Sequence, residues 1–269
     1  MADSILVTSM KVFTPSDAAA YLRDSKNVIS PSLKIKVAKR RMKSLFPTLI
    51  YANSKPAVGL VAMCSKPNLS KEISVNPASA FVITPDGVCL TNYHVVYAYA
   101  HSKTLNDQGI FLIRLGNGRT YVMEKVLALS PQDDLALIKI DVKGERLPYV
   151  KLRNMDAEVG EKAYVLGNSF GQLYSLTQGI VSGKYNETMV LPGRTGRAAR
   201  NLMSITADFS VGASGSPILD NNGYVIGIVS STNIVEQQSN GRPMTQMVIK
   251  NAIPVSSIKH LIQSIVSSN

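Results

Sequence analysis

From Val58 onward, apolar residues occur in short β-branched runs that are separated by turn residues. Runs of this kind are typical of strands, and separators such as Asp86-Gly87 and Gly116-Asn117-Gly118 are typical of tight turns. We expect about a dozen strands, at 58–63, 80–84, 88–92, 110–115, 122–130, 135–140, 162–166, 179–182, 203–206, 217–219, 224–230 and 244–249. Because no helical pattern separates these runs, they predict an antiparallel all-β architecture and not a parallel sheet.

The two ends of the chain show a helical pattern instead. Thr14-Pro15-Ser16-Asp17, followed by residues 18–23, predicts a short capped helix with proline near its first turn. Residues 33–51 predict a second helix, which Pro47 should kink or divide. Residues 256–266 place their apolar side chains on one face, and therefore predict an amphipathic helix at the C-terminal end.

Composition narrows the class of protein. With 269 residues and 45% apolar residues, the chain can bury a core, which excludes wholesale disorder. Two cysteines cannot form a disulfide framework, and no run of apolar residues is long enough to predict a membrane span. Asp3 stands where a signal peptide carries positive charge, so we expect a cytoplasmic protein unless an export signal was removed before the numbering begins.

The net charge of +11 is mostly a local feature. Six basic residues lie close together without an acid between them, at Lys34, Lys36, Lys39, Arg40, Arg41 and Lys43. Without them the chain carries about +5, which is ordinary for a soluble protein of this size. Because no aromatic residues alternate with these charges, we expect no nucleic-acid partner.

The first segment with chemical potential is Gly212-Ala213-Ser214-Gly215-Ser216-Pro217, directly before a predicted strand and turn. Acyl transfer by serine needs an exposed hydroxyl beside backbone amides that face the developing oxyanion. Gly212 leaves the backbone free to turn, so that its N–H and that of Ser214 can converge. Taken alone, such a run of small residues more often forms an ordinary turn.

Two further segments contain a histidine and an aspartate. His94 lies at the end of an apolar strand pattern and is one of three histidines. Asp134 directly precedes the apolar run 135–140, so its carboxylate should be buried and need a partner such as an imidazole N–H. On its own, a histidine in an apolar strand is usually a core residue, and an aspartate before a strand usually belongs to a turn or protects an edge.

The combination of these three residues is far less common than each one. His94, Asp134 and Ser214 follow one another at spacings of 40 and 80 residues on an all-β background. In a serine-protease triad the histidine accepts the serine proton, and the aspartate holds the histidine tautomer and stabilises imidazolium. The order predicts Ser214 as nucleophile, His94 as general base and then acid, and Asp134 as orienting carboxylate.

The segments around the three residues resemble the trypsin-like serine proteases and, within them, the disulfide-free HtrA (Deg) family, over residues 57–266. Residues 80–96 resemble the strand, turn and strand that lead to that family's catalytic histidine, and 134–140 resemble its aspartate strand. Leu166-Gly167-Asn168-Ser169-Phe170-Gly171 and Thr177-Gln178-Gly179-Ile180-Val181-Ser182 resemble the opening of its second barrel. Asn251-Ala252-Ile253-Pro254 resembles the end of its protease domain.

This resemblance implies the chymotrypsin fold, with two six-stranded antiparallel β-barrels packed face to face and the triad between them. The first barrel would comprise residues 57–150, and the second barrel with the C-terminal helix residues 151–269. Residues 1–56 match no part of the family, and we expect a partly helical extension that serves regulation or assembly.

The resemblance also assigns binding residues. It implies that the backbone N–H groups of Gly212 and Ser214 form the oxyanion hole. It further implies that Ser230, Ser231 and Thr232 pair with an extended substrate as an added strand.

Two features depart from the family pattern. HtrA proteins usually carry PDZ domains after the protease domain, and we expect none in this chain, which stops at Asn269. Asp208 lies six residues before Ser214, where trypsin-like enzymes have the aspartate that selects Arg or Lys. HtrA proteins have an aspartate two residues further upstream and prefer small apolar side chains. Either the loop is shortened and Asp208 is structural, or Asp208 and the neighbouring Phe209 contact the substrate in a trypsin-like pocket.

Together these features predict a serine endopeptidase that hydrolyses peptide bonds in extended or unfolded protein segments. It would need no cofactor and no metal, and it would prefer Arg or Lys if Asp208 lies in the pocket. The alternative is a catalytically silent protease-like module that binds a protein partner or a polyanion. The sequence leaves open the physiological substrate and whether the protein is a monomer or a trimer.

Overall fold

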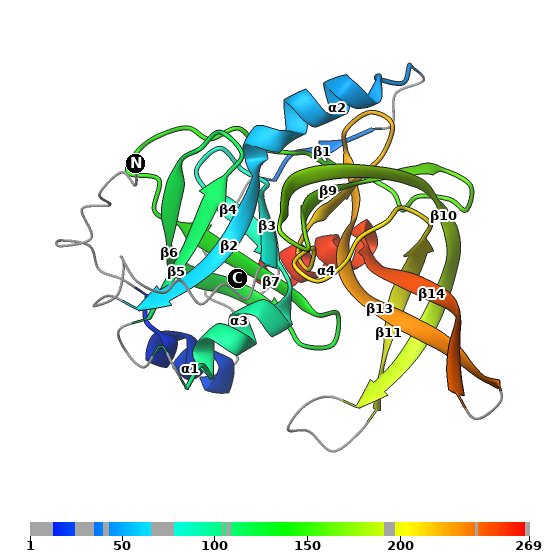
Figure 1. Cartoon of the computed structure of the whole chain (residues 1–269). Coiled ribbons are helices and arrows are strands. Elements are labelled where there is room, and N and C mark those ends of the chain that lie inside the picture. The colour runs from blue at the N-terminus through cyan, green and yellow to red at the C-terminus, as the bar shows by residue number, and fades with distance from the viewer. Residues whose placement is uncertain are drawn as a thin grey trace.

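The computed structural model describes residues 13–24, 35–39, 43–65, 78–103, 105, 109–190, 197–239 and 242–266. Lys34, Arg40 and Arg41 of the basic segment lie outside the described residues. Most of the described chain forms strands in two units that lie side by side, with short helices around them (Figure 1). The strands pair antiparallel apart from two short parallel pairings at β8, which confirms the predicted architecture.

Six strands close into the first barrel, in the order β2-β3-β4-β7-β6-β5. They are β2 (Val58–Ser65), β3 (Ala78–Val82), β4 (Val88–Thr91), β5 (Gly109–Leu115), β6 (Thr120–Ser130) and β7 (Leu135–Ile140). Fully buried side chains such as Phe81, Phe111 and Leu137 fill this unit. The first six-stranded barrel is therefore confirmed.

The second unit is an eight-stranded sheet in the order β1-β8-β13-β12-β9-β10-β11-β14. Its strands are β1 (Val37–Ala38), β8 (Leu152–Arg153), β9 (Lys162–Ser169), β10 (Gln172–Val190), β11 (Arg197–Ile205), β12 (Pro217–Leu219), β13 (Val225–Ser239) and β14 (Arg242–Pro254). Because β13 also pairs with β14, six of the strands form a ring. The predicted second barrel is confirmed as far as this ring, to which β8 and β1 are added as two further strands.

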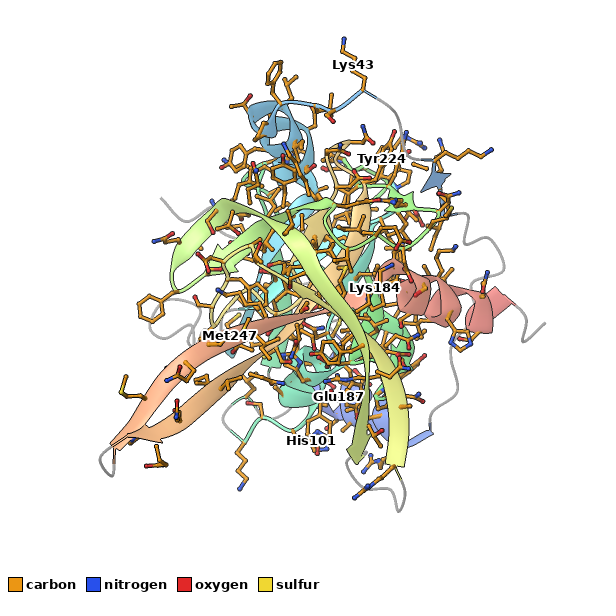
Figure 2. All side chains as sticks on the ribbon, turned by 90° about the vertical axis from the view of Figure 1, so that its right-hand side faces the viewer. Lys43, His101, Lys184, Glu187, Tyr224 and Met247 are labelled. Atoms are coloured by element: carbon orange, nitrogen blue, oxygen red, sulfur yellow. The ribbon has the colours of Figure 1, made fainter. Side chains whose placement is uncertain are left out.

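Two hairpins of the second unit extend well beyond the ring (Figure 2). β10 and β11 pair outward to Val190 and Arg197, and β13 and β14 pair outward to Ser239 and Arg242. The strands predicted at 179–182 and 224–230 cover only the inner parts of these hairpins. The strand predicted at 244–249 lies in the outer part of β14. The outer parts of β10, β11 and β13 are mostly polar and therefore lack the apolar run by which a strand is recognised.

Helix α1 (Pro15–Asp24) begins as predicted. The Asp17 carboxylate accepts hydrogen bonds from the Thr14 N–H at 2.9 Å and the Thr14 hydroxyl at 3.0 Å, and the Asp17 N–H donates back to Thr14 Oγ1 at 3.2 Å. This reciprocal pair satisfies N–H groups that the first turn of a helix leaves unpaired. Helix α4 (Val255–Val266) likewise confirms the predicted C-terminal helix.

The helix predicted over residues 33–51 is wrong. Val37 and Ala38 form strand β1, and helix α2 (Pro47–Ser54) begins at the proline, followed by a short 3₁₀ turn at Lys55–Ala57. Proline is favoured in the first turn of a helix and excluded from its interior, so Pro47 starts a helix here and does not divide one.

One hydrophobic core runs through both units and holds them in place. It includes Phe81 and Leu137 of the first barrel together with Leu219 and Ile228 of the second unit. Residues from the two units therefore meet at fixed positions. Among the described residues, no helix is long and apolar enough to cross a membrane.

Candidate active site

The first barrel brings His94 and Asp134 together. β4 pairs with β7 at Thr91 and Ala136, so the residue that follows β4 lies beside the residue that precedes β7. Asn92 Nδ2 and the Tyr93 N–H both donate to the Asp134 carbonyl, at 2.9 and 3.1 Å. His94 itself lies in the first turn of helix α3 (Tyr93–Ala100), whereas the sequence predicts a strand end at this position.

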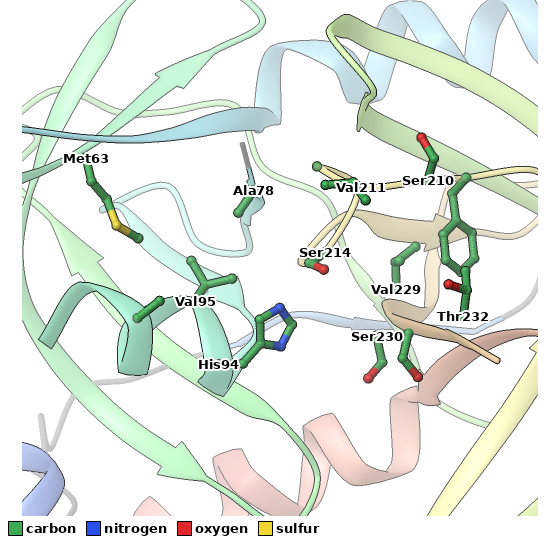
Figure 3. Close-up of a pocket in the computed structure, with 14 residues that line it drawn as sticks. Met63, Ala78, His94, Val95, Ser210, Val211, Ser214, Val229, Ser230 and Thr232 are labelled. Carbon is green, nitrogen blue, oxygen red and sulfur yellow. The ribbon is translucent and has the colours of Figure 1, made fainter. Parts of the chain in front are cut away.

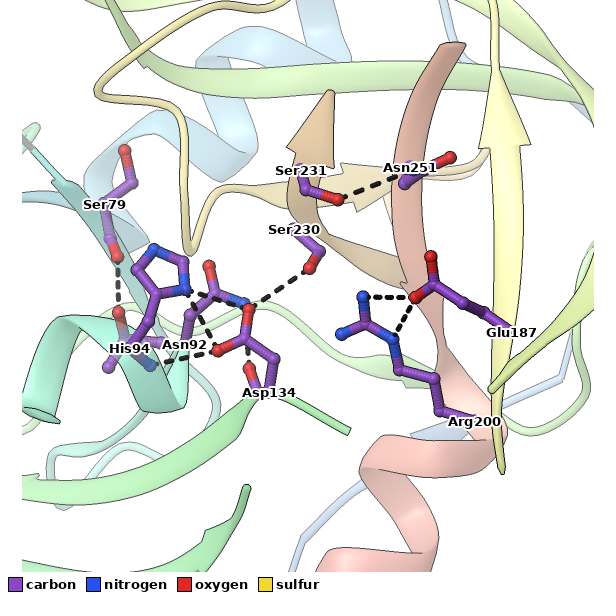
Figure 4. Close-up of polar contacts among 10 residues, drawn as sticks. Ser79, Asn92, His94, Asp134, Glu187, Arg200, Ser230, Ser231 and Asn251 are labelled. Carbon is purple, nitrogen blue, oxygen red and sulfur yellow. Dashed lines mark hydrogen bonds and ion pairs between the residues drawn. The ribbon is translucent and has the colours of Figure 1, made fainter. Parts of the chain in front are cut away.

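The Asp134 carboxylate holds the His94 ring in a defined orientation (Figure 4). His94 Nδ1 lies 3.0 Å from Asp134 Oδ1 and 2.9 Å from Oδ2. The backbone N–H of His94 donates to Oδ1 at 3.0 Å, and Ser230 Oγ donates to Oδ2 at 3.1 Å. With a carboxylate beside Nδ1, that nitrogen carries the proton and the lone pair is on Nε2. The ring can therefore accept a proton on the side that faces away from Asp134.

Ser214 lies in the loop between β11 and β12 of the second unit, and its side chain lines the same pocket as His94 (Figure 3). The pocket has a volume of about 320 Å³. Within the described part of the chain, no hydrogen bond joins Ser214 Oγ to His94. In unliganded enzymes such bonds are often long and shorten only when substrate binds.

The loop before Ser214 forms a type II turn at residues 210–213. The Ala213 N–H donates to the Ser210 carbonyl at 3.0 Å, and Gly212 adopts φ +97°. A type II turn needs positive φ at its third residue, which glycine accommodates without strain. Gly212 is thus required by the shape of the turn.

A neighbouring loop sets the direction of the Gly212 N–H. The Phe170 N–H donates to the Val211 carbonyl at 2.8 Å. Because the C=O and N–H of one trans peptide point to opposite sides, this bond directs the Gly212 N–H away from Phe170. Within the described residues, neither the Gly212 N–H nor the Ser214 N–H has an acceptor. Two unpaired amides beside a serine are what the stabilisation of an oxyanion requires.

Ser79 of the first barrel fixes the Ser214 loop, although the sequence analysis missed this residue. The Ser79 N–H donates to the Ser214 carbonyl at 2.7 Å, and Ser79 Oγ donates to the Gly212 carbonyl at 3.1 Å. Thr91 Oγ1 in turn donates to the Ser79 carbonyl at 2.8 Å. The available signal was a serine and a threonine in strands that are otherwise apolar, since buried polar side chains need specific partners.

The residues proposed to bind substrate separate into two groups. Phe209, Ser230, Ser231 and Thr232 line the pocket together with the buried side chain of Val229. Asp208 does not line it: the Asp208 side chain is 82% exposed and forms an ion pair with Lys250 of β14. The Asp208 carboxylate therefore lies outside the set of residues that line this pocket.

The two cysteines, Cys64 and Cys89, are buried in strands of the first barrel as free thiols. Burial raises the pKa of Cys64 and of Cys89. Neither residue lines the pocket at His94. Across the described residues, no group of three or more His, Cys, Asp or Glu side chains is arranged to hold a metal ion.

Comparison with known proteins identifies relatives of this chain. The family of trypsin-like peptidase domains matches residues 78–228. The chain is 33% identical over 156 residues to "Protease Do-like 5, chloroplastic" of Arabidopsis thaliana, which covers 57% of this chain and 47% of that protein. It is 30% identical over 190 residues to a "Probable periplasmic serine endoprotease DegP-like" of Chlamydia trachomatis serovar D, which covers 70% of this chain and 33% of that protein. The chain thus spans less than half the length of these two relatives.

Solved structures share the fold. The crystal structure of Deg5 superposes with a TM-score of 0.58 at 24% identity and covers 81% of this chain and 93% of that one. A serine endoprotease from Yersinia pestis superposes with a TM-score of 0.56 at 23% identity and covers 84% of this chain and 68% of that one. At these identities the likeness concerns the fold alone.

Proposed function

The chain belongs to the trypsin-like serine peptidase family and is related to the HtrA/Deg proteases, and on this premise we propose that it is a serine endopeptidase that cleaves extended protein segments through an acyl-enzyme. One observation carries the proposal most directly. Ser214, with two unpaired amides beside it, shares a pocket with a His94 ring whose Nδ1 lies 2.9 Å from the Asp134 carboxylate. The proposed nucleophile and base thus line one pocket, and the proposed orienting acid contacts the base.

In the proposed mechanism, His94 Nε2 takes the Ser214 proton while Oγ attacks the scissile carbonyl carbon. The carbonyl oxygen becomes an oxyanion that accepts hydrogen bonds from the Gly212 and Ser214 N–H groups. When the intermediate collapses, the C–N bond breaks and imidazolium gives its proton to the leaving amine. Water, deprotonated by His94, then attacks the ester carbon and releases the acid product and free Ser214.

We propose that the pocket accepts a small or medium apolar side chain before the scissile bond. The walls beside Ser214 include Phe209 and Val229, whose side chains are apolar and largely buried. Asp208 is paired with Lys250 outside the pocket, so it supplies no buried negative charge to a Lys or Arg side chain. A substrate cation would therefore lose its hydration without gaining a partner.

Labelling with a fluorophosphonate tests the proposed nucleophile. We expect wild-type protein to be labelled and to cleave an unfolded protein such as reduced casein, and Ser214→Ala to do neither. Ser182→Ala, which removes an exposed hydroxyl on β10 outside the pocket, is the matched control and should behave like wild type. Wild-type protein that stays unlabelled and still captures an unfolded protein would favour the catalytically silent module.

A peptide panel that differs only at the residue before the cut tests the pocket. We expect Val or Ala to be preferred to Arg by about tenfold or more in kcat/KM, since an unpaired buried cation costs several kcal/mol. A preference for Arg would contradict this proposal and would indicate that Asp208 contacts the substrate side chain. The cytoplasmic location expected from the N-terminal sequence stays a prediction.

A further inference from the structure

The strand that contains the proposed substrate-pairing segment continues far beyond it. Ser230, Ser231 and Thr232 line the pocket, and β13 runs on from them without interruption to Ser239. Residues 230–238 span about 30 Å at the rise of an antiparallel strand. A substrate that pairs with the first three of these residues is already aligned with the rest of the strand.

One edge of this extension is unpaired. On one side, residues 231–239 pair with β14, whereas the pairing of β13 with β12 ends at Ile228. Within the described chain, no other strand pairs with β13 beyond that point. Because alternate residues of a strand direct their N–H and C=O groups to opposite edges, about half of these residues leave both groups free for a further strand.

The sequence of β13 does not protect this edge. Natural proteins block exposed edges with proline, lysine or bulges. β13 contains neither proline nor lysine, and its own extra residue, Ser230, lies at the pocket end of the segment, so the residues beyond it carry none of these features on β13. The outer edge of β14 differs, because it carries Pro243 near the tip and the extra residue Gln246 at a bulge. Of the two edges of the hairpin, the one that continues from the pocket is the one left open.

Apolar side chains lie exposed on both faces of the hairpin. Ile234 pairs with Val248 across the strands, and on the opposite face Val235 pairs with Met247. These side chains are between 41% and 61% exposed, and Figure 2 shows Met247 on the part of the hairpin that extends away from the ring. An isolated two-stranded ribbon is marginally stable in water, and a third strand would add backbone hydrogen bonds and cover apolar surface.

We propose that the N-terminal side of an extended protein substrate adds to the free edge of β13, from Ser230 to Gln238, as the third strand of this hairpin. The inference rests on the proposed proteolytic function and gives it a substrate class. Preferred substrates would be unfolded segments that carry β-forming apolar residues well upstream of the cut, where they contact Ile234 on one face or Val235 on the other.

A series of peptides tests this proposal. All share one cleavable core, and they are lengthened upstream in steps of one Val-Thr dipeptide. A parallel series has the same lengths but carries proline at alternate positions, which removes the N–H groups that a strand needs. We expect kcat/KM to rise with length by at least about tenfold in total for the Val-Thr series, and to stay level for the proline series.

Two shortened hairpins localise the effect. In the first variant, residues 233–249 are replaced by Asn-Gly, so that the Thr232–Lys250 pair closes the hairpin and the segment from Ser230 to Thr232 is kept. In the matched control, residues 189–198 of the other long hairpin are replaced by Asn-Gly, closed by the Thr188–Ala199 pair. We expect the first variant to cleave the shortest peptide as fast as wild type, but its kcat/KM should no longer rise with peptide length. The control should cleave the shortest peptide normally and keep the rise of kcat/KM with length.

Peptide binding to the Ser214→Ala variant tests strand addition at β13 separately from the proposed proteolytic activity. Fluorescence anisotropy with labelled long and short peptides reports the affinity gain without catalysis, in the full hairpin and in the 233–249 variant. The proposal is overturned if the long peptide gains nothing, if the gain survives in that variant, or if the proline series gains equally. A gain that survives while light scattering shows a smaller assembly would instead identify a second copy of the chain as the occupant.

Discussion

At the scale of single residues, the site depends on polar groups that are each held by several neighbours. The Asp134 carboxylate accepts hydrogen bonds from the His94 ring, the His94 backbone and the Ser230 hydroxyl. The backbone carbonyl of Asp134 accepts two more hydrogen bonds, from Asn92 Nδ2 and the Tyr93 N–H. Such a residue has little freedom to adopt another rotamer, so the orientation that it gives to His94 is fixed before substrate arrives.

Asp134→Asn should therefore lower kcat strongly. An amide that donates to Nδ1 would favour the tautomer with the proton on Nε2, which cannot accept the Ser214 proton, and a loss of about 10⁴-fold is expected. Ser230→Ala removes only one of the donors to the carboxylate and should lower kcat by about 10- to 100-fold. Steady-state kinetics on one peptide compares the two variants, and equal losses would contradict the orienting role.

Gly215→Ala should destabilise the protein and abolish activity. Gly215 adopts φ +85°, and a Cβ at this position would collide with the Ser79 carbonyl and the Thr91 hydroxyl. Gly118→Ala is the matched control, because Gly118 has φ +87° with open space around it. We expect urea unfolding to show a loss of about 1 kcal/mol for the control and about 3 kcal/mol or more for Gly215→Ala. If both variants lost similar free energy of unfolding, the positive φ and not the collision of the Cβ would explain the loss.

At the scale of elements, loops and not strands set the geometry of the proposed oxyanion site. The bond from the Phe170 N–H to the Val211 carbonyl joins the β9–β10 loop to the loop before Ser214. The Phe170 side chain is 86% exposed, so its backbone and not its packing makes this connection. The β9–β10 loop thus holds the Gly212 N–H in its orientation.

Phe170→Pro tests that support, since proline has no N–H and cannot adopt the φ of +45° found at this residue. We expect kcat to fall by about 10²- to 10³-fold with little change in KM, as when an oxyanion donor is lost. Phe170→Gly keeps the N–H and accepts positive φ, so it should retain near wild-type kcat. If Phe170→Gly is as impaired as Phe170→Pro, the side chain and not the N–H is responsible.

The same scale shows what the sequence could predict. The strands of the first barrel are apolar on both faces or alternate clearly, so their positions follow from the pattern, and the capping residues Thr14 and Asp17 predict the start of α1. The spacing of His94, Asp134 and Ser214 predicted a catalytic triad; in the structure Asp134 contacts the His94 ring, and His94 and Ser214 line one pocket. The full length of the β10–β11 and β13–β14 hairpins could not be predicted, because outside 244–249 their outer residues are mostly polar.

The contacts of Asp208 and Phe170 could not be predicted from the sequence. Asp208 forms its ion pair with Lys250, 42 residues further along the chain, and such a pairing exists only once β14 lies beside that loop. Phe170 acts through its backbone N–H group, which every residue except proline has. A sequence carries no sign of which of these groups will matter.

At the scale of the whole molecule, the two units share one hydrophobic core and should unfold together. Leu219 and Ile228 of the second unit belong to the same buried cluster as Phe81 of the first barrel. Separate unfolding would expose this shared surface to water, which opposes a stable half-folded state.

Thiol exposure during urea unfolding checks this prediction. Burial raises the pKa of Cys89 in β4, so this thiol is protonated and shielded in the folded protein and reports on the first barrel alone. Far-UV circular dichroism reports on both units. We expect the two probes to give the same midpoint, whereas an earlier midpoint for circular dichroism would show that the second unit unfolds independently.

The bonds from Ser79 to the Ser214 loop have a consequence for biosynthesis. His94 and Asp134 leave the ribosome first, and Ser214 follows Asp134 by 80 residues, which takes about 4–16 s at ordinary rates of translation. Until β12, β13 and β14 have also emerged and the second unit can fold, we expect Ser79 not to hold the Ser214 loop in the proposed oxyanion geometry. We therefore expect a nascent chain of this protein to be harmless to its neighbours on a polysome until β14 has left the ribosome.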